Sequence, residues 1–175
     1  MTASFEIKRA APSDAAALAA FAARLFRDTY SDDTAAADLD DYVAKSFSAE
    51  LQAAEIGDPE AAVFMATDGG VLAGYAYVVF SPEEADLALL SRIYVDANWR
   101  GRGVANHLLN AAIAECAAHN VGRLRLTVYE KNARAIAFYS KVGFAVMGTT
   151  TFTVGDDVQA DLVMELDVMA RRADH

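Results

Sequence analysis

The sequence predicts an α/β (α+β) protein with a mixed, mostly antiparallel central sheet of about seven strands and helices on both faces. Alternating segments and segments of helical period are interleaved in the order β-α-α-β-β-β-α-β-α-β-β. A 54% hydrophobic composition over 175 residues is enough for a sizeable core. A turn that contains glycines also joins a buried strand to a helix just past mid-chain. We expect one domain over residues 1–175.

In the first half, residues 5–9 alternate as a strand, and Pro12 precedes a helix with Ser13 or Asp14 as its N-cap. That helix has an apolar stripe that includes Leu18 and Leu25. The further elements expected here are a helical region after Thr34, a short helical piece over 49–56, and strands 62–67 and 71–80 joined by the turn 68–70.

The second half is expected to hold strand 88–95, a helix over about 103–119, strand 123–129, a helix from Asn132 to Gly143, and a hairpin of 144–154 with 158–168. The buried stripe of the first of these helices is expected to contain Val104, Leu108, Leu109, Ala112, Ile113 and Cys116.

Charge and composition exclude several classes. A formal net charge of -10 argues against a general nucleic-acid binder. No apolar run approaches the ~20 residues that span a bilayer, and the N-terminus lacks the order of a secretory signal. With one cysteine there is no internal disulfide, so we expect a cytoplasmic protein, and its three scattered histidines predict no metal site.

The segment 93–109 is the most informative. A buried strand ends, and the turn Arg100-Gly101-Arg102-Gly103-Val104-Ala105 opens a helix. Free N–H groups at a helix start favour an anion, and glycines let the backbone approach it closely. Arg92, Arg100 and Arg102 supply positive charge in an acidic chain. The alternative is a tight turn with solvated arginines.

Two other phosphate motifs fit poorly. The dinucleotide motif needs a third glycine where Asn106 stands, and it belongs in an early βα unit. The P-loop pattern, a glycine-rich loop ending in Gly-Lys-Ser/Thr, is absent.

Arg100-x-x-Gly103-x-Ala105 resembles the R/Q-x-x-G-x-G/A signature of the GCN5-related N-acetyltransferases (GNAT), and the order of elements is also similar to theirs. The resemblance implies acetyl-CoA as cofactor, with its pyrophosphate on this turn. It also implies that the strand Ile93-Tyr94-Val95 leaves its neighbour through a bulge, so that freed N–H groups contact the pantetheine arm and polarise the thioester carbonyl.

A second segment, 130–144, resembles the family's N-x-x-A-x-x-F-Y-x-K-x-G-F pattern. Asn132 and Tyr139 lie seven apart and so share one helix face. The resemblance places Asn132 and Lys141 with the cofactor, and Tyr139 near its sulfur as the proton donor to the leaving thiolate. The structural alternatives are an N-cap for Asn132 and a packed aromatic ring for Tyr139.

Acyl transfer needs a neutral amine, whereas an alkylammonium is neutral only about one part in 10³ at pH 7. A base, water chain or desolvation must remove the proton. Residues 88–92 lack the glutamate that relatives often carry, which leaves Glu83, Glu84 or Asp86 acting through water, or a solvated acidic turn. Direct ternary-complex transfer is expected, with Cys116 packed in the core.

The segments 26–30 and 151–164 resemble the PaiA-type spermidine/spermine N-acetyltransferases. We therefore expect Phe26, Tyr30 and Tyr94 at the acceptor, a small-molecule amine such as a polyamine. The first helices also carry clustered carboxylates that would attract a polycation, namely Asp28, Asp32, Asp33, Asp38, Asp40 and Asp41.

Several alternatives stay open at this point. The acceptor could be an amino acid, an aminoglycoside-like drug, or a protein N-terminus or lysine. The chain could instead be a non-catalytic CoA sensor or an unrelated nucleotide-binding module. The C-terminal hairpin offers an edge for homodimer pairing.

Overall fold

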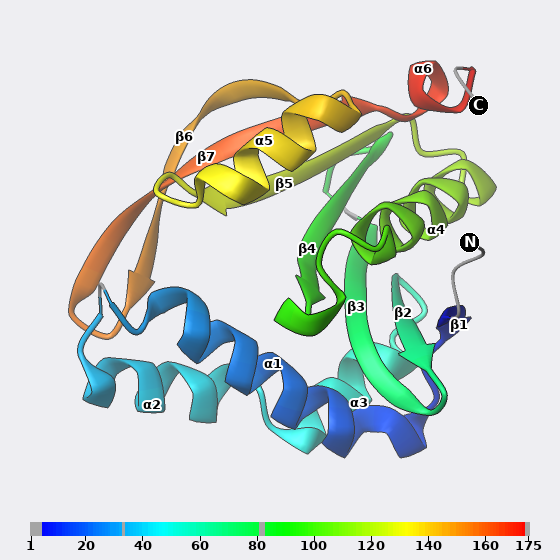
Figure 1. The fold of residues 1–175 in the computed structure, drawn as a ribbon. Helices are drawn as coiled ribbons and strands as arrows, with labels where there is room; N and C mark the ends of the chain where they lie inside the picture. Colours follow the sequence, from blue (N-terminus) through cyan, green and yellow to red (C-terminus); the bar gives the residue numbers. More distant parts are fainter. Residues whose placement is uncertain (1–4, 33, 81–82, 174–175) are drawn as a thin grey trace.

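The computed structural model describes residues 5–32, 34–80 and 83–173, and its centre is a seven-stranded sheet of order β1-β2-β3-β4-β5-β7-β6 (Figure 1). The strands are β1 (Phe5–Arg9), β2 (Ala61–Asp68), β3 (Val71–Phe80), β4 (Leu87–Val95), β5 (Arg123–Tyr129), β6 (Ala145–Val154) and β7 (Asp157–Asp167). The α-helices are α1 (Ala15–Tyr30), α2 (Ala36–Ser46), α3 (Ala49–Gly57), α4 (Val104–Ala118), α5 (Ala133–Val142) and α6 (Val168–Ala173). Every described strand pair is antiparallel except β4 with β5, so the mixed sheet expected from the sequence is confirmed.

Helices cover both faces of the sheet, as predicted. One core lies between the sheet and helices α4 and α5, and it holds Leu108, Ile113 and Cys116 of the predicted α4 stripe. The second core lies on the other face, where α1 and α2 pack their stripes, including Leu18 and Leu39, against β2 and β3. Each core consists of side chains that alternate along the strands, which is the pattern from which the strands were predicted.

Strand β4 contains a bulge at Ser91. Tyr77 pairs with Arg92 and Val78 with Leu90, so Ser91 is the extra residue. Leu90 belongs to the α4 core, and three positions later Ile93 packs against that same core. The bulge therefore reverses the alternation, which turns Tyr94 towards the α1 side of the sheet.

Strands β4 and β5 pair at only one end. Their parallel register runs from Leu87 with Arg123 to Leu89 with Arg125, and the strands diverge beyond it (Figure 1). The remaining half of β4, from Leu90 to Val95, thus presents one backbone edge to no strand among the described residues. We call this divergence the β4–β5 splay.

The structure corrects two details of the predicted boundaries. Residues Pro12–Asp14 form a short 3₁₀ helix before α1, and Asp14 stands at the N-cap position of α1 as expected, but its carboxylate accepts from the Ala11 N–H at 2.8 Å and makes no capping bond to α1. The last strand ends at Asp167, whose carboxylate accepts from the N–H groups of Met169 and Ala170 and so starts α6. None of the described helices is long and apolar enough to cross a bilayer.

Candidate active site

The turn after β4 has the geometry of an anion site. Gly101 has φ +79° and Gly103 has φ +87°, a left-handed conformation that residues with a Cβ adopt only at a cost. Gly103 is the N-cap of α4, and the first α4 hydrogen bond joins the His107 N–H to the Gly103 carbonyl at 3.0 Å. The N–H groups of Val104, Ala105 and residue 106 precede that bond, so they have no partner within the helix.

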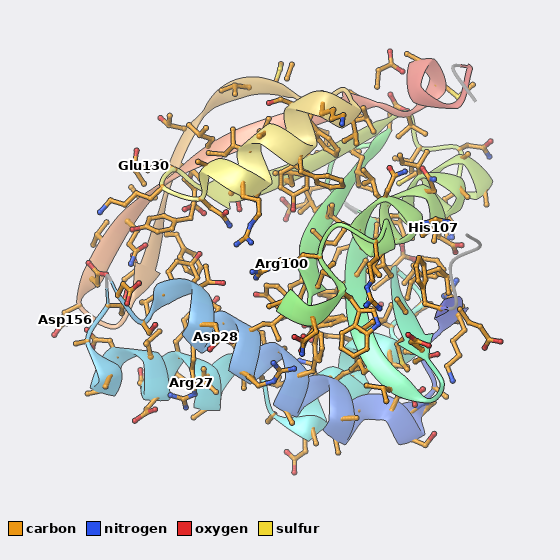
Figure 2. All side chains as sticks on the ribbon, in the orientation of Figure 1. Arg27, Asp28, Arg100, His107, Glu130 and Asp156 are labelled. Atoms are coloured by element: carbon orange, nitrogen blue, oxygen red, sulfur yellow. The ribbon has the colours of Figure 1, made fainter. Side chains whose placement is uncertain are left out.

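Two arginines from different elements lie within electrostatic range of each other here. Arg100, labelled in Figure 2, follows β4, and Arg134 lies in the first turn of α5. Both residues are exposed. Partial burial and then the Arg134 charge hold the pKa of Arg100 below its usual value. Within the described chain, neither these two nor Arg102 forms an ion pair. Asp96 and Asp28 also act electrostatically on Arg100, but neither forms an ion pair with it, and like charges outside ion pairs favour an anion between them.

Sequence reasoning did not single out Arg134. A cation in the first turn of a helix is unfavourable because it opposes the helix dipole. This unfavourable position of Arg134 is the signal in the sequence that could have indicated an anion-binding role. Its position two residues after the Asn132 cap places it beside the same motif that was recognised.

Arg92 does not supply charge to this turn, contrary to the sequence-based expectation. Its guanidinium donates to both carboxylate oxygens of Glu55 on α3, at 2.8 and 2.7 Å. It also lies over the rings of Phe47 and Tyr77. The bulge at Ser91 gives the physical reason, because it turns Arg92 to the α1–α3 side of the sheet.

The free edge of β4 offers backbone donors. The Asp96 N–H donates to the Ala73 carbonyl at 2.8 Å, and a Cβ built on Gly74 would lie 2.6 Å from the Tyr94 carbonyl oxygen. The backbone groups of Tyr94 therefore face β3. By alternation, the N–H groups of Ile93 and Val95 face the β4–β5 splay. Tyr94 contributes its ring, which packs edge-on against Tyr75 with centroids 5.6 Å apart.

Helix α5 holds the second predicted segment. Asn132 is its N-cap, and the side chain accepts from the Ala135 N–H at 3.2 Å. Tyr139 is 8% exposed and packs against Phe138 and Phe144. Burial and then the nearby Tyr94 raise the pKa of Tyr139, so its phenol keeps its proton at neutral pH. Lys141 is exposed in the last turn of α5, at the end opposite to Asn132.

Two of the three acceptor residues expected from the sequence, Phe26 and Tyr30, lie in an aromatic cluster between α1, α2 and the β6–β7 hairpin. The Phe26 ring stacks on the Tyr42 ring with centroids 4.5 Å apart. The centroid of the Tyr30 ring lies 5.3 Å from that of Tyr129 and 5.9 Å from that of Phe152. We call Phe26, Tyr30, Tyr42, Phe47, Tyr129 and Phe152 the aromatic cluster. Tyr94 lies outside this cluster but packs against the same core on the α1 side of the sheet as Tyr30, Tyr42 and Phe152.

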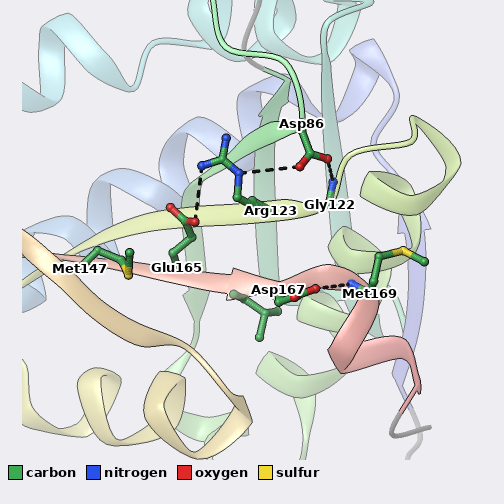
Figure 3. A pocket seen from close by; sticks show the side chains of 8 residues that line it. Asp86, Gly122, Arg123, Met147, Glu165, Asp167 and Met169 are labelled. Carbon is green, nitrogen blue, oxygen red and sulfur yellow. Dashed lines mark hydrogen bonds and ion pairs between the residues drawn. The ribbon is translucent and has the colours of Figure 1, made fainter.

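The acidic turn before β4 is not part of this arrangement. Glu84 pairs with Arg123 at 2.8 Å, and Asp86 accepts from the Gly122 N–H at 2.5 Å. These contacts lie beside a hollow of about 510 Å³ at the paired end of β4 and β5, where Arg123 also reaches Glu165 (Figure 3). Because these charges satisfy one another at the end of β4 opposite to the glycine turn 100–105, we assign no chemistry to the hollow.

Cys116 is fully buried in the α4 core. Burial raises the pKa of its thiol to about 12, which leaves almost no thiolate at neutral pH. Core packing, as expected from the sequence, is therefore its role.

Comparisons with known proteins agree with this geometry. The family model described as the acetyltransferase (GNAT) family matches residues 20–144. An uncharacterized N-acetyltransferase of Mycobacterium tuberculosis is 34% identical over 152 residues, which cover 87% of this chain and 96% of that protein. A probable spermine N(1)-acetyltransferase of Bacillus subtilis subsp. natto is 30% identical over 89 residues, or 47% of this chain and 59% of that protein.

Among solved structures, a PaiA N-acetyltransferase from Thermoplasma acidophilum in complex with coenzyme A matches with a TM-score of 0.80. The match covers 95% of this chain and 99% of that one at 22% identity, which establishes a shared fold.

Fold, site and matches together define an acyltransferase that uses acetyl-CoA as its donor. The chain belongs to the GNAT family of N-acetyltransferases.

Proposed function

We propose that the protein acetylates a primary amine of a polyamine-like small molecule by direct transfer in a ternary complex. Bound acetyl-CoA supplies the acetyl group: a C–N bond forms, the C–S bond breaks, and an alkylammonium yields an amide, a CoA thiol and one proton. The β4–β5 splay is the observation that carries the proposal. It leaves a free strand edge with a glycine turn at its end and Tyr139 on α5, the helix that follows β5.

The residues fit the donor. The N–H groups at the start of α4, together with Arg100, Arg102 and Arg134, match the charge of a diphosphate. The N–H groups of Ile93 and Val95 can donate to the pantetheine arm and to the negative charge that develops on the carbonyl oxygen. We assign Asn132 and Lys141 to the cofactor on the family resemblance.

Tyr139 would supply a proton. Its phenol stays protonated because burial raises its pKa, so it can donate to the departing sulfur. The ammonium proton would leave through water. Glu55 on the α1–α3 face of the sheet is a carboxylate that could act as a base, but it is already paired with Arg92.

Three observations support a polyamine as the acceptor: the exposed carboxylates of the first helices, the aromatic cluster, and the Bacillus relative whose name specifies spermine. The acidic helices contribute less than the sequence count predicts. Asp40 pairs with Arg27 and Asp41 with Lys45, whereas Asp28 and Asp32 are exposed, and Asp33 lies outside the described residues. The aromatic cluster provides faces for a cation and for methylene groups.

A thiol-release assay with acetyl-CoA tests this proposal. Spermidine, an amino acid, an aminoglycoside and a lysine peptide would be compared at matched concentrations. We expect the highest kcat/KM with spermidine. A higher value for another acceptor would reassign the substrate, and tight CoA binding without turnover on any amine would indicate a sensor.

We also propose a homodimer that uses the edge strand β6 in the cytoplasm. Residues 145–151 are exposed along β6, with Val146 at 54% and Met147 at 63%. Exposed apolar groups on a sheet edge favour pairing. Light scattering at micromolar concentration tests this, and a monomer mass would overturn it.

A further inference from the structure

Strand β7 carries two buried oxygens that have no hydrogen-bond partner among the described residues. They are Oδ1 of Asp161 and Oε1 of Gln159, and the two residues are 5% and 7% exposed. Buried acceptors are normally paired, so two orphans on one strand need an explanation. Because the residues are two apart, they lie on one face of β7, about 7 Å from each other along the strand.

The orientation of the Gln159 amide follows from its neighbours. Its Nε2 donates to the Thr34 hydroxyl at 2.8 Å and to Oδ2 of Asp157 at 2.6 Å. The Thr34 hydroxyl itself donates to that carboxylate oxygen at 3.0 Å. Since Asp157 can only accept, the amide nitrogen must face this network, and Oε1 is left without a donor.

Aromatic rings border the same face. In the sheet register Asp161 stands opposite Tyr129 of β5, and Gln159 stands opposite Phe152 of β6. The Tyr30 ring lies close to both of these rings. The Asp161 carboxylate also acts electrostatically on Tyr30 and Tyr42. A carboxylate and an amide oxygen therefore border the aromatic cluster without a donor of their own.

We propose that Asp161 and Gln159 bind a second, non-reacting ammonium group of the acceptor, which makes Asp161 the residue that selects diamines and polyamines over monoamines. This inference rests on the proposed function and names the substrate class of that same site. An ammonium group carries only donors, the complement of the two orphan acceptors. The aromatic faces would hold its charge and the adjoining methylene groups.

The position of Asp161 fits an acceptor with charges at two ends. Tyr94 and Tyr30 pack against the same core on the α1 side of the sheet, and the Tyr30 ring lies 5.3 Å from the ring of Tyr129, which stands opposite Asp161. An amine that reacts near Tyr94 can thus extend an alkyl chain along Tyr30 towards β7. A monoamine of equal length offers no second donor to the Asp161 carboxylate, so its binding gains nothing from this residue.

The test compares butylamine, 1,4-diaminobutane and spermidine as acceptors for the wild-type enzyme and for Asp161→Asn. The control is Asp156→Asn, which removes the same charge from an exposed residue of the same hairpin (Figure 2). Calorimetry with CoA confirms that each variant is folded. Losing a hydrogen bond to a charged group is expected to lower kcat/KM for the two polyamines roughly 10- to 100-fold through KM, with butylamine unchanged.

The outcomes separate the two levels of the proposal. If the wild type prefers 1,4-diaminobutane to butylamine and only Asp161→Asn removes the preference, the assignment of Asp161 stands. If polyamines are good substrates but Asp161→Asn keeps the wild-type preference, the inference fails and the proposed function survives. If the wild type neither binds nor acetylates the polyamines, both fail.

Discussion

The Arg24 guanidinium on α1 donates to the Asp96 carboxylate at 2.6 Å and so ties the first helix to the end of β4. Asp96 is 6% exposed, and its other oxygen accepts from the Asn98 N–H at 2.9 Å. The Asn98 bond, and then Arg24, hold the pKa of Asp96 below its usual value against the opposing effect of burial. The segment that leads to the glycine turn 100–105 therefore starts from a fixed point that is also tied to α1.

Arg24→Ala should weaken both stability and cofactor binding. Removing the partner of a buried carboxylate is expected to cost about 1–3 kcal/mol in the free energy of unfolding and to raise KM for acetyl-CoA several-fold. Urea unfolding and steady-state kinetics measure the two effects. Arg27→Ala is the control on the same helix, because its pair with Asp40 is exposed and should contribute less than about 1 kcal/mol. Equal effects of the two variants would contradict the role given to Asp96.

Gly103→Ala should impair cofactor binding beyond its effect on stability. A Cβ at φ +87° costs roughly 1–2 kcal/mol, and relief of this strain would shift the N–H groups at the start of α4 that we propose bind the diphosphate. Gly70→Ala is a matched control, since Gly70 has φ +85° in the β2–β3 turn and open space around a Cβ. Both should lower Tm by similar amounts, whereas only Gly103→Ala should raise the Kd for CoA, about 10-fold or more. Calorimetry that finds equal Kd values would remove the turn from the site.

Local patterns explain why the glycine turn and the helix after it could be predicted and other parts of the candidate site could not. Gly101, Gly103 and the α4 stripe act within one short stretch of chain, so spacing alone located them. The sequence near Ser91 carries no signal for a bulge beyond the family resemblance, and without the bulge Arg92 was expected on the wrong side of the sheet.

Asp161 illustrates the contacts that one sequence cannot supply. In the chain it is one acidic residue among 25. Its significance comes from the sheet register, which sets it opposite Tyr129, and from its buried Oδ1, which has no hydrogen-bond partner among the described residues. Both depend on how three strands and two helices meet, which periodicity does not encode.

Tyr139→Phe should lower kcat about 100-fold or more with nearly unchanged affinity for CoA, because loss of a general acid affects the transition state rather than binding. Stopped assays at saturating acetyl-CoA measure kcat, and calorimetry measures Kd. Tyr42→Phe serves as the control within the aromatic cluster, where a phenyl ring keeps the stacking on Phe26. Unchanged kcat in the Tyr139 variant would exclude it as the proton donor.

Asp161→Asn should stabilise the empty protein at neutral pH while it impairs polyamine turnover. Burial, and then the charge of Glu130, raise the pKa of Asp161 above its unfolded value of about 3.9. The folded chain therefore binds more protons than the unfolded chain between the two pKa values, and wild-type stability falls as pH rises through the folded pKa. Asparagine does not titrate, so we expect a gain in the free energy of unfolding on the order of 1–2 kcal/mol at pH 8 that shrinks as pH falls towards 4.

Urea unfolding of both proteins across this pH range measures the difference in stability, and the exposed Asp156→Asn should show none. A variant that is less stable at pH 8 would mean that Asp161 has a stabilising partner in the folded chain, and it could then no longer be a carboxylate held ready for a cation.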